Sequence, residues 1–510
     1  MLRLEQITDS EQLRQVALLL ESENRRLHER LAVLVAELAA LKGKSGAEQL
    51  QLELLKLKEQ MATLQHRMFG RSSEKLPHEA PPAESDAPPP RPRRGHGPKE
   101  QPLLPTMEKH YELPESEREC IVCNGQMEPL GEQTEDAQEI TVVERQYVLV
   151  THKKHKYRCR CNASVTTAPG PLKLISGGRY SLEFAIQVAL DKYAYHLPLE
   201  RQVRMMTRLG LGIDSQTLWD QLQALERILN PAYALIHAHL LSTEVLHADE
   251  TPWSLLKKGG SEKWHVWALS SQDAVYYHID PARSTQVLID LLPDYNGVVI
   301  ADGYICYQTL ARSNPKLVLA HCMAHARRKY VEALPCYPQC SVPLGYIKEL
   351  YQIEQGLPSL RGLAGEDRAR ALALRKKVRQ EQSAPRMDAL HNWAVEQSAL
   401  RQSLLDKAIS YMLSLWTGLR RFVDDPRLCI DNNLVERDLR GCAVGRKNHY
   451  GSKSLRGTQV AATFYTLIET AHRCGLDPGQ YLLAAARHAL QNPGSALLPW
   501  QMAQSQAPAA

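Results

Sequence analysis

The chain has 510 residues, too many for one hydrophobic core, so several domains are expected. Lys and Arg number 62 against 57 Asp and Glu, and this mildly basic balance permits nucleic-acid binding without requiring it. No apolar leader and no apolar run of about 18 residues is present, which argues against secretion and membrane insertion. The odd total of 11 cysteines fits a reducing cytoplasm, with metal-bound or free thiols, better than a disulfide scaffold.

Residues 1–68 predict a coiled coil. Apolar residues recur at alternating steps of three and four, which keeps one stripe facing a partner helix. Asn24 occupies a core position of this repeat, as is typical of parallel dimers, so we expect a homodimer or a higher oligomer. A break at 43–46 leaves open an intramolecular hairpin instead.

Residues 69–106 are rich in proline and predict an extended linker. Residues 107–170 then carry two cysteine pairs on either side of a strand-rich span: Cys120 with Cys123, and Cys159 with Cys161. Four thiolates suit tetrahedral zinc in a small β module with little core of its own. The second pair has only one intervening residue, so His152 or His155 is an alternative ligand. Free thiols are the alternative to a metal site.

Residues 171–241 predict a helical region that contains a helix-turn-helix candidate. A helix at 199–208 leads through a glycine-containing turn to a capped second helix at 214–222. Gln216 and Thr217 fall on the first turn of that second helix, where base contacts are commonly made. A helical pair that binds no DNA is the alternative.

Two aspartates each end an apolar strand. Asp249 closes the run that begins at Val245, and Asp302 closes the run 298–301. Two further strand-like runs and an amphipathic segment lie between them, which is the order of a ribonuclease-H-like sheet. In that fold two strand-end aspartates and a later helical acid hold two magnesium ions. Glu436 is the third candidate, on a helical pattern at 431–440.

Several motifs agree in order and spacing with a known family. They are His247-Ala-Asp-Glu-Thr-Pro, Ala301-Asp-Gly-Tyr, Ala320-His-Cys-Met-Ala-His-Ala-Arg-Arg-Lys, Asn432-Asn-Leu-Val-Glu-Arg and Gly445-Arg-Lys-Asn. The chain resembles the DDE-type transposase of the insertion-sequence-66 family, the large subunit called TnpC. The resemblance implies that Asp249, Asp302 and Glu436 are catalytic ligands of Mg²⁺ (or Mn²⁺). It also implies Zn²⁺ in the module at 107–170.

The residue types suit that chemistry. Magnesium is a hard cation that prefers carboxylate oxygens, and two ions can activate a nucleophile and hold the leaving oxygen. The catalytic domain is expected at 242–458, with a helical insertion at about 331–425, followed by a C-terminal helical segment at 459–510. The whole chain is therefore expected to be multidomain α+β: coiled coil, zinc module, helical region and ribonuclease-H-like α/β domain.

Other polar residues are candidates for supporting roles. Cys322 and His325 form a Cys-x-x-His pair that is either structural or half of a metal site, which Cys336 or Cys340 would complete. Phosphate contacts are expected from a basic run on the same helix and from a later motif: Arg327, Arg328, Lys329, Arg446 and Lys447.

We therefore expect a transposase that binds the terminal inverted repeats of its mobile element, cleaves them and transfers the strands. One alternative is a metal-dependent nuclease without strand transfer. Another is a catalytically inactive DNA-binding protein that uses the zinc and helix-turn-helix modules. The expected partners are element-end and target DNA and small accessory transposition proteins, with no membrane, at a cytoplasmic, nucleoid-associated location.

Overall fold

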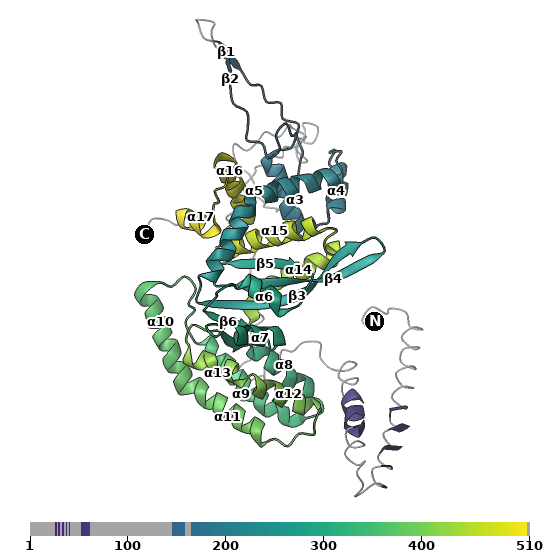
Figure 1. Ribbon diagram of the computed structural model, residues 1–510, viewed down its shortest axis with the longest axis vertical. Coiled ribbons are helices and arrows are strands. Elements are labelled where there is room, and N and C mark those ends of the chain that lie inside the picture. Colours follow the sequence, from purple (N-terminus) through teal and green to yellow (C-terminus); the bar gives the residue numbers. More distant parts are fainter. Residues whose placement is uncertain are drawn as a thin grey trace, which may run out of the picture. The chain divides into compact units, whose positions relative to one another are not determined.

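The computed structural model describes residues 145–158 and 165–506, together with 53–61 and single positions between 26 and 40 (Figure 1). Apart from Arg145 and Gln146, every described residue belongs to one compact unit. The linker at 69–106 and the four predicted zinc ligands Cys120, Cys123, Cys159 and Cys161 lie outside the described residues. Within the described part, no helix is long and apolar enough to cross a membrane.

Part of the predicted heptad segment is described and is helical. Residues 53–61 form a helix, and Leu54, Leu57 and Met61 of the predicted apolar stripe are half-buried on it. Leu27 and Leu34, from the same stripe, are also helical and buried. Asn24 lies outside the described residues, so the coiled coil and its oligomeric state stay predictions.

A small antiparallel hairpin precedes the main body of the chain. Its strands are β1 (Lys156–Arg158) and β2 (Val165–Thr167), paired with Lys156 opposite Thr167. His152 and His155, the alternative zinc ligands, are exposed on the segment that leads into β1. The hairpin matches the strand-rich character predicted for this region, while the zinc site itself remains a prediction.

The central sheet has five strands in the order β5-β4-β3-β6-β7. Their bounds are Val245–Lys257 for β3, Gly260–Ser270 for β4, Val275–Asp280 for β5, Val298–Ala301 for β6 and Val318–His321 for β7. Strands β3, β4 and β5 are consecutive antiparallel neighbours, whereas β6 and β7 run parallel to β3 on its other side. The predicted combination of helices with a mixed sheet is confirmed.

The hairpin of β3 and β4 is longer than the rest of the sheet. β6 pairs only with Val245–His247, and β5 pairs only with the last part of β4. The two-residue turn at its tip contains Gly259, whose φ of +86° is accessible to glycine at little cost. The outer half of β3 is instead braced by Ser452, which exchanges backbone hydrogen bonds with Ser254 and Leu256. Asp249 therefore lies where β3 leaves the shared part of the sheet.

The two faces of the sheet are covered by different sets of helices (Figure 1). Because side chains alternate along a strand, Val299 and Ala301 face one hydrophobic core, while Val298 and Ile300 face the other. The first core is packed by helices from both ends of the described chain: α3 (Leu182–Tyr193), α5 (Ser215–Leu241), α14 (Asn433–His449), α15 (Leu455–Arg473) and α16 (Pro478–Gln491). The regions 171–241 and 459–510 thus share one core with the sheet.

Helix α15 also closes the free edge of the sheet. β5 is an edge strand, and the Val275 N–H donates to Thr470 Oγ1 at 3.1 Å, while the Tyr277 N–H donates to Thr466 Oγ1 at 2.9 Å. The two threonines lie one helical turn apart, so they match the spacing of the outward N–H groups of the strand. Edge groups that would otherwise be open to another chain are satisfied in this way.

The second core is formed by α8 (Met323–Ala333) and by the segment predicted as a helical insertion at about 331–425, in which every described element is helical. The α-helices of that segment are α9 (Ser341–Gln355), α10 (Gly365–Val378), α11 (Ala384–Glu396), α12 (Leu404–Ser414) and α13 (Trp416–Asp424). A π-helical stretch, Arg379–Ser383, joins α10 to α11. The segment packs on Val298, Ile300 and Ala320 of the sheet. Helices α6 (Thr285–Leu291) and α7 (Ile305–Ser313) connect the strands.

A buried arginine ties the insertion to the loop before α14. Arg379 is fully buried and makes a two-pronged ion pair with Glu354, with N–O distances of 2.8 and 2.7 Å. Its remaining donors reach the backbone oxygens of Phe422, Asp425 and Leu428. These contacts hold the chain at 425–428, and α14 begins a few residues later.

Candidate active site

Asp249 and Asp302 come from neighbouring parallel strands. β3 and β6 pair with His247 opposite Ile300. Asp249 and Asp302 each stand two residues further along, at the same end of this strand pair, and the Asp302 carboxylate acts electrostatically on Asp249. Residues two apart on a strand share a face, and here it is the face of Ile300, which the helices of the insertion cover.

Burial and neighbouring acids favour the protonated form of Asp249. Its pKa is raised from 3.8 to about 7, first by burial and then by repulsion from the carboxylates of Glu250, Asp302 and Glu436. The Glu250 N–H donates to Asp249 Oδ1 at 2.8 Å and offsets part of this rise. The structure thus brings Asp302 and Glu436 within electrostatic reach of Asp249.

The backbone around Asp302 is held from several sides. The Tyr304 N–H donates to Asp302 Oδ1 at 2.8 Å, and the Gly303 N–H donates to the Tyr411 hydroxyl at 3.2 Å. A β-carbon at Gly303 would lie 2.7 Å from Leu415 and 2.8 Å from Tyr411, so no larger residue fits without displacing the insertion. The insertion therefore contacts the turn that presents Asp302.

Glu436 lies in the first turn of α14, which Asn432 anchors to the sheet. The fully buried Asn432 side chain donates to the Ala248 carbonyl at 2.9 Å, and its oxygen lies 3.0 Å from His247 Nδ1. Since that oxygen can only accept, His247 Nδ1 carries the proton. Burial lowers the pKa of His247 to about 4, so the ring is neutral near pH 7. These bonds fix where α14 starts relative to β3, and hence where Glu436 stands.

Cys322 and His325 meet Glu436. Cys322 immediately precedes α8, and its sulfur accepts the Asn432 backbone N–H at 3.2 Å. The ligand atoms of Cys322, His325 and Glu436 all lie within 4.8 Å of one another. Burial raises the pKa of the Cys322 thiol to about 12. Cys336 and Cys340, the other candidates for completing a site with Cys322, are not members of this group.

The two acids adjacent in sequence to the predicted set are engaged elsewhere. Glu250 bonds Arg283, with an N–O distance of 2.6 Å, and accepts the Tyr307 hydroxyl at 2.8 Å. Asp438 accepts from Ser270 at 2.6 Å and is paired with Arg473. Arg283 and Arg473 therefore occupy these carboxylates, whereas the carboxylates of Asp302 and Glu436 act electrostatically on Asp249.

Of the basic residues predicted to contact phosphate, some are exposed and others are paired within the protein. Arg328 and Lys447 are exposed, on α8 and α14 respectively. Lys329 pairs with Glu332 at 3.3 Å, and Arg327 also has an interaction partner. Arg446 donates to the Thr251 hydroxyl at 2.9 Å and to the Pro252 carbonyl. Arg446 thus ties α14 to β3, and a DNA contact from it stays a prediction.

The glycines around Arg446 have packing roles. A β-carbon at Gly445 would overlap the Tyr465 hydroxyl. One at Gly451 would overlap the Ser254 carbonyl, and the φ of Gly451 is +108°. This motif holds the end of α14 against the outer half of β3.

The helix-turn-helix candidate has the predicted local form. Helix α4 (Leu199–Arg208) is followed by a turn containing Gly210, with φ of +84°, and then by α5. Asp214 caps α5 by accepting the Thr217 N–H at 2.6 Å. Gln216 is exposed on the first turn and bonds Asp220 at 2.9 Å. DNA contact by Gln216 and Thr217 stays a prediction.

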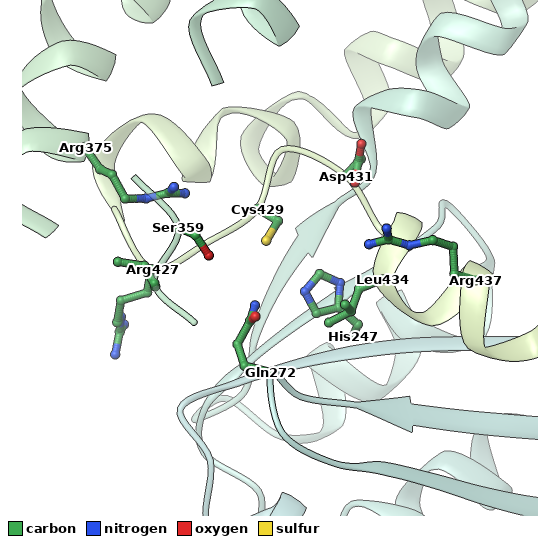
Figure 2. Close-up of a pocket in the computed structure, with 10 residues that line it drawn as sticks. His247, Gln272, Ser359, Arg375, Arg427, Cys429, Asp431, Leu434 and Arg437 are labelled. Atoms are coloured by element: carbon green, nitrogen blue, oxygen red, sulfur yellow. The ribbon is translucent and has the colours of Figure 1, made fainter. Parts of the chain in front are cut away.

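A separate cavity of about 240 Å³ lies beside the start of α14 (Figure 2). It is lined by residues that include His247, Arg375, Arg427, Asp431 and Arg437, and none of the three predicted acids lines it. Arg375, on α10, points inward and donates to the Pro426 carbonyl at 2.8 Å. The cavity therefore borders His247, the hydrogen-bond partner of Asn432, and not the three predicted acids.

The sequence predicts no role for Tyr411 or Arg379, and it marks Asn432 only as part of a family motif. Asn432 directly precedes a helical pattern, and that position was the available signal of a capping or anchoring role. Tyr411 and Arg379 had no such signal, because their contacts join segments far apart in the chain.

Comparison with known proteins places the chain in a class of DNA-processing enzymes. The family described as "Transposase IS66 family" matches residues 177–460, a span that contains the sheet, all three acids and the helical insertion. The protein belongs to the IS66 family of transposases, which confirms the resemblance drawn from the motifs.

Relatives in Sinorhizobium fredii extend the match. "Uncharacterized protein y4jD" is 33% identical over 427 residues, which cover 78% of this chain and 81% of the relative. "Uncharacterized protein y4hP" is 29% identical over 75% of this chain and 73% of its own. "Uncharacterized protein y4qI" is 28% identical over 81% and 77%, respectively. The likeness therefore extends over most of each chain.

Proposed function

We propose that the protein is a DDE-type transposase that binds the terminal inverted repeats of its element and catalyses metal-dependent cleavage and strand transfer. The observation that carries this proposal is the β3–β6 register, which pairs His247 with Ile300 two residues before Asp249 and Asp302, together with the electrostatic influence of Asp302 and Glu436 on Asp249. The strand order β5-β4-β3-β6-β7, with three antiparallel strands followed by two parallel ones, supports a ribonuclease-H-like catalytic domain.

The donor set suits a divalent cation. The carboxylates of Asp302 and Glu436 repel that of Asp249, which is itself partly buried. A hard cation such as Mg²⁺ or Mn²⁺ would be held by Asp249, Asp302 and Glu436 and would relieve this repulsion. Two such ions, when bound, supply activation of the attacking oxygen and stabilisation of the leaving oxygen in phosphodiester chemistry.

The protein's own residues prepare this site. The Tyr304 N–H orients the Asp302 carboxylate, and the Glu250 N–H orients that of Asp249. Asn432 fixes the first turn of α14, so that Glu436 approaches from a set direction. Such positioning of donors before substrate arrives is what a metal-dependent phosphoryl transfer asks of the polypeptide.

DNA would be bound by surfaces around and beyond this site. Exposed Arg328 and Lys447 lie on the two helices that present His325 and Glu436, and are suited to phosphate contacts. Gln216 at the start of α5 is a candidate for base contact. The zinc module, the coiled-coil dimer and the small accessory proteins complete the proposal as predictions from the sequence.

The proposal is tested with purified full-length protein and DNA that carries the element's ends. Binding, cleavage and joining to a target are measured with and without magnesium, for the wild type and for Asp302→Asn. We expect all three activities in the wild type and binding alone in the variant. The neighbouring accessory proteins are added in a parallel reaction.

The other outcomes distinguish the alternatives. Cleavage without joining, with the accessory proteins present, would indicate a nuclease. Binding without cleavage in either protein, under the same conditions, would indicate an inactive DNA-binding protein. Equal cleavage by the wild type and Asp302→Asn would mean that the reaction occurs at another site.

A further inference from the structure

The group formed by Cys322, His325 and Glu436 has the composition of a metal site. Cys322 and His325 come from the N-terminal end of α8, and Glu436 comes from the first turn of α14. Their ligand atoms lie within 4.8 Å of one another. Among the residues that the structure describes, no other three His, Cys, Asp or Glu side chains bring their ligand atoms this close together.

Two of the ligand atoms are buried without a hydrogen-bond partner. His325 Nδ1 and Glu436 Oε1 are 3.7 Å apart, too far for a hydrogen bond, and neither is satisfied by another group. Buried polar atoms are rarely left in this state, so the pair points to something that lies between them. Two ligands about 2.1 Å from one tetrahedral ion are themselves roughly 3.4 Å apart, so a small inward shift would close the site.

The sulfur is held toward the same point. Cys322 Sγ accepts the Asn432 backbone N–H at 3.2 Å, which orients the sulfur and would stabilise a thiolate. Asn432 is the residue that anchors α14 to β3, so the loop that carries the N–H donor is itself fixed. All three side chains thus belong to rigid elements rather than to a free loop.

We propose that Cys322 Sγ, His325 Nδ1 and Glu436 Oε1 bind one thiophilic divalent cation of the Zn²⁺ type. Thiolate and imidazole ligands select such an ion over magnesium, which prefers oxygen throughout. Three protein ligands leave one coordination position for solvent or another oxygen donor. The site does not include the two aspartates, and it would fix one oxygen of Glu436.

The test is the metal content of the full-length protein, purified from zinc-supplemented cells and dialysed against magnesium-free buffer. The wild type is compared with Cys322→Ser and His325→Gln, and with Cys306→Ser as the matched control. Cys306 is a second buried free cysteine, outside the group. Zinc bound at 107–170 is common to all four proteins and cancels in the comparison. Because no DNA is present, the result does not depend on whether the protein cleaves DNA.

We expect Cys322→Ser and His325→Gln each to lose one equivalent of zinc, and Cys306→Ser to keep the wild-type content. Equal content in all four proteins would overturn the proposal and leave His325 and Glu436 as an ion pair. Circular dichroism checks that each variant is folded. If the Cys322 variant does not fold, cobalt loading of the wild type and His325→Gln decides. A thiolate-to-cobalt charge-transfer band that is equally strong in both would also overturn the proposal.

Discussion

His247 and Asn432 share a buried hydrogen bond, 3.0 Å from Nδ1 to Oδ1, although they are 185 residues apart in the chain. Through this bond, and the one from Asn432 to the Ala248 carbonyl, β3 and the start of α14 form one rigid unit. Asp249 stands two residues beyond His247, and Glu436 stands four residues beyond Asn432. The pair therefore sets the distance between two of the three acids.

Replacing Asn432 tests this anchor. In Asn432→Ala, the Ala248 carbonyl and His247 lose their partners, so we expect a loss of about 1–3 kcal/mol in the free energy of unfolding. Displacement of Glu436 should also lower the cleavage rate on the order of 100-fold. Asn433→Ala is the matched control, since Asn433 is exposed and its side chain bonds only Asp431. Urea denaturation and cleavage rates measure both effects, and full activity in Asn432→Ala would refute the positioning role.

The raised pKa of Asp249 predicts a pH-dependent stability before metal is bound. A group whose pKa rises on folding, here from 3.8 to about 7, stabilises the folded state at low pH and ceases to do so as pH rises through this range. Asp249→Asn has no charge to bury. In magnesium-free buffer it should therefore be more stable than the wild type near pH 8, by on the order of 2–4 kcal/mol, and equal to it near pH 4.

Thermal melting of both proteins across this range measures the difference. Burial of neutral His247 acts in the opposite direction, but it is common to both proteins and cancels. Added magnesium should stabilise the wild type more than Asp249→Asn. A stability difference that did not change with pH would contradict the shared acidic site.

The turn after β6 predicts a strict requirement for glycine. In Gly303→Ala, the new methyl group would overlap Leu415 and Tyr411, so the turn that presents Asp302 must move. We expect a loss of about 1–3 kcal/mol and a large fall in cleavage rate. Gly345→Ala is the control, because Gly345 lies on α9 with open space around it. That change should be neutral or stabilising by up to about 1 kcal/mol. Equal behaviour of the two variants in melting and cleavage assays would contradict the close packing.

Arg379 predicts a large contribution of one buried ion pair to the insertion. Arg379→Met removes both hydrogen bonds to the partly buried Glu354 carboxylate and the donor to the Phe422 and Asp425 carbonyls, so about 3–5 kcal/mol of stability should be lost. Arg375 still pairs with Glu354 at 3.7 Å and bonds the Leu428 carbonyl at 3.3 Å. Arg386→Met removes an exposed pair with Glu349 and should cost less than about 1 kcal/mol. Denaturant midpoints of the two variants measure the contrast. A small effect of Arg379→Met would mean that the loop before α14 is held by other contacts.

The sequence predicted the features that depend on short runs of neighbouring residues. The apolar runs that stop at Asp249 and Asp302 predicted two strands, and both are present. The expected strand end at Asp249 was wrong, because β3 continues through Pro252 to Lys257 as one arm of the long hairpin with β4, and only Asp302 follows a strand end. The helical pattern at 431–440 predicted Glu436 as the third acid, and the family motif Asn432-Asn-Leu-Val-Glu-Arg agreed with it. The mixed sheet and the family were predicted correctly for these reasons.

Other features depend on contacts that no local pattern records. The meeting of Glu436 with Cys322 and His325 requires α8 and α14 to be placed in space, and the sequence offered Cys336 and Cys340 as partners instead. The composition of α10 also does not show that the Arg375 side chain points inward, because a basic helix has the same composition whether its arginines face solvent or backbone oxygens. Long-range packing decides both.

The most direct test of the account compares two neighbouring acid variants in magnesium-dependent cleavage of element-end DNA. Glu436→Gln removes the carboxylate of one of the three proposed metal ligands, whereas Glu250→Gln changes a carboxylate that Arg283 and Tyr307 already bind. The account predicts no detectable cleavage by Glu436→Gln and a loss of less than about tenfold for Glu250→Gln, in proteins that bind the DNA equally. Cleavage by Glu436→Gln at the wild-type rate, or its abolition by Glu250→Gln alone, would contradict the assignment of Asp249, Asp302 and Glu436.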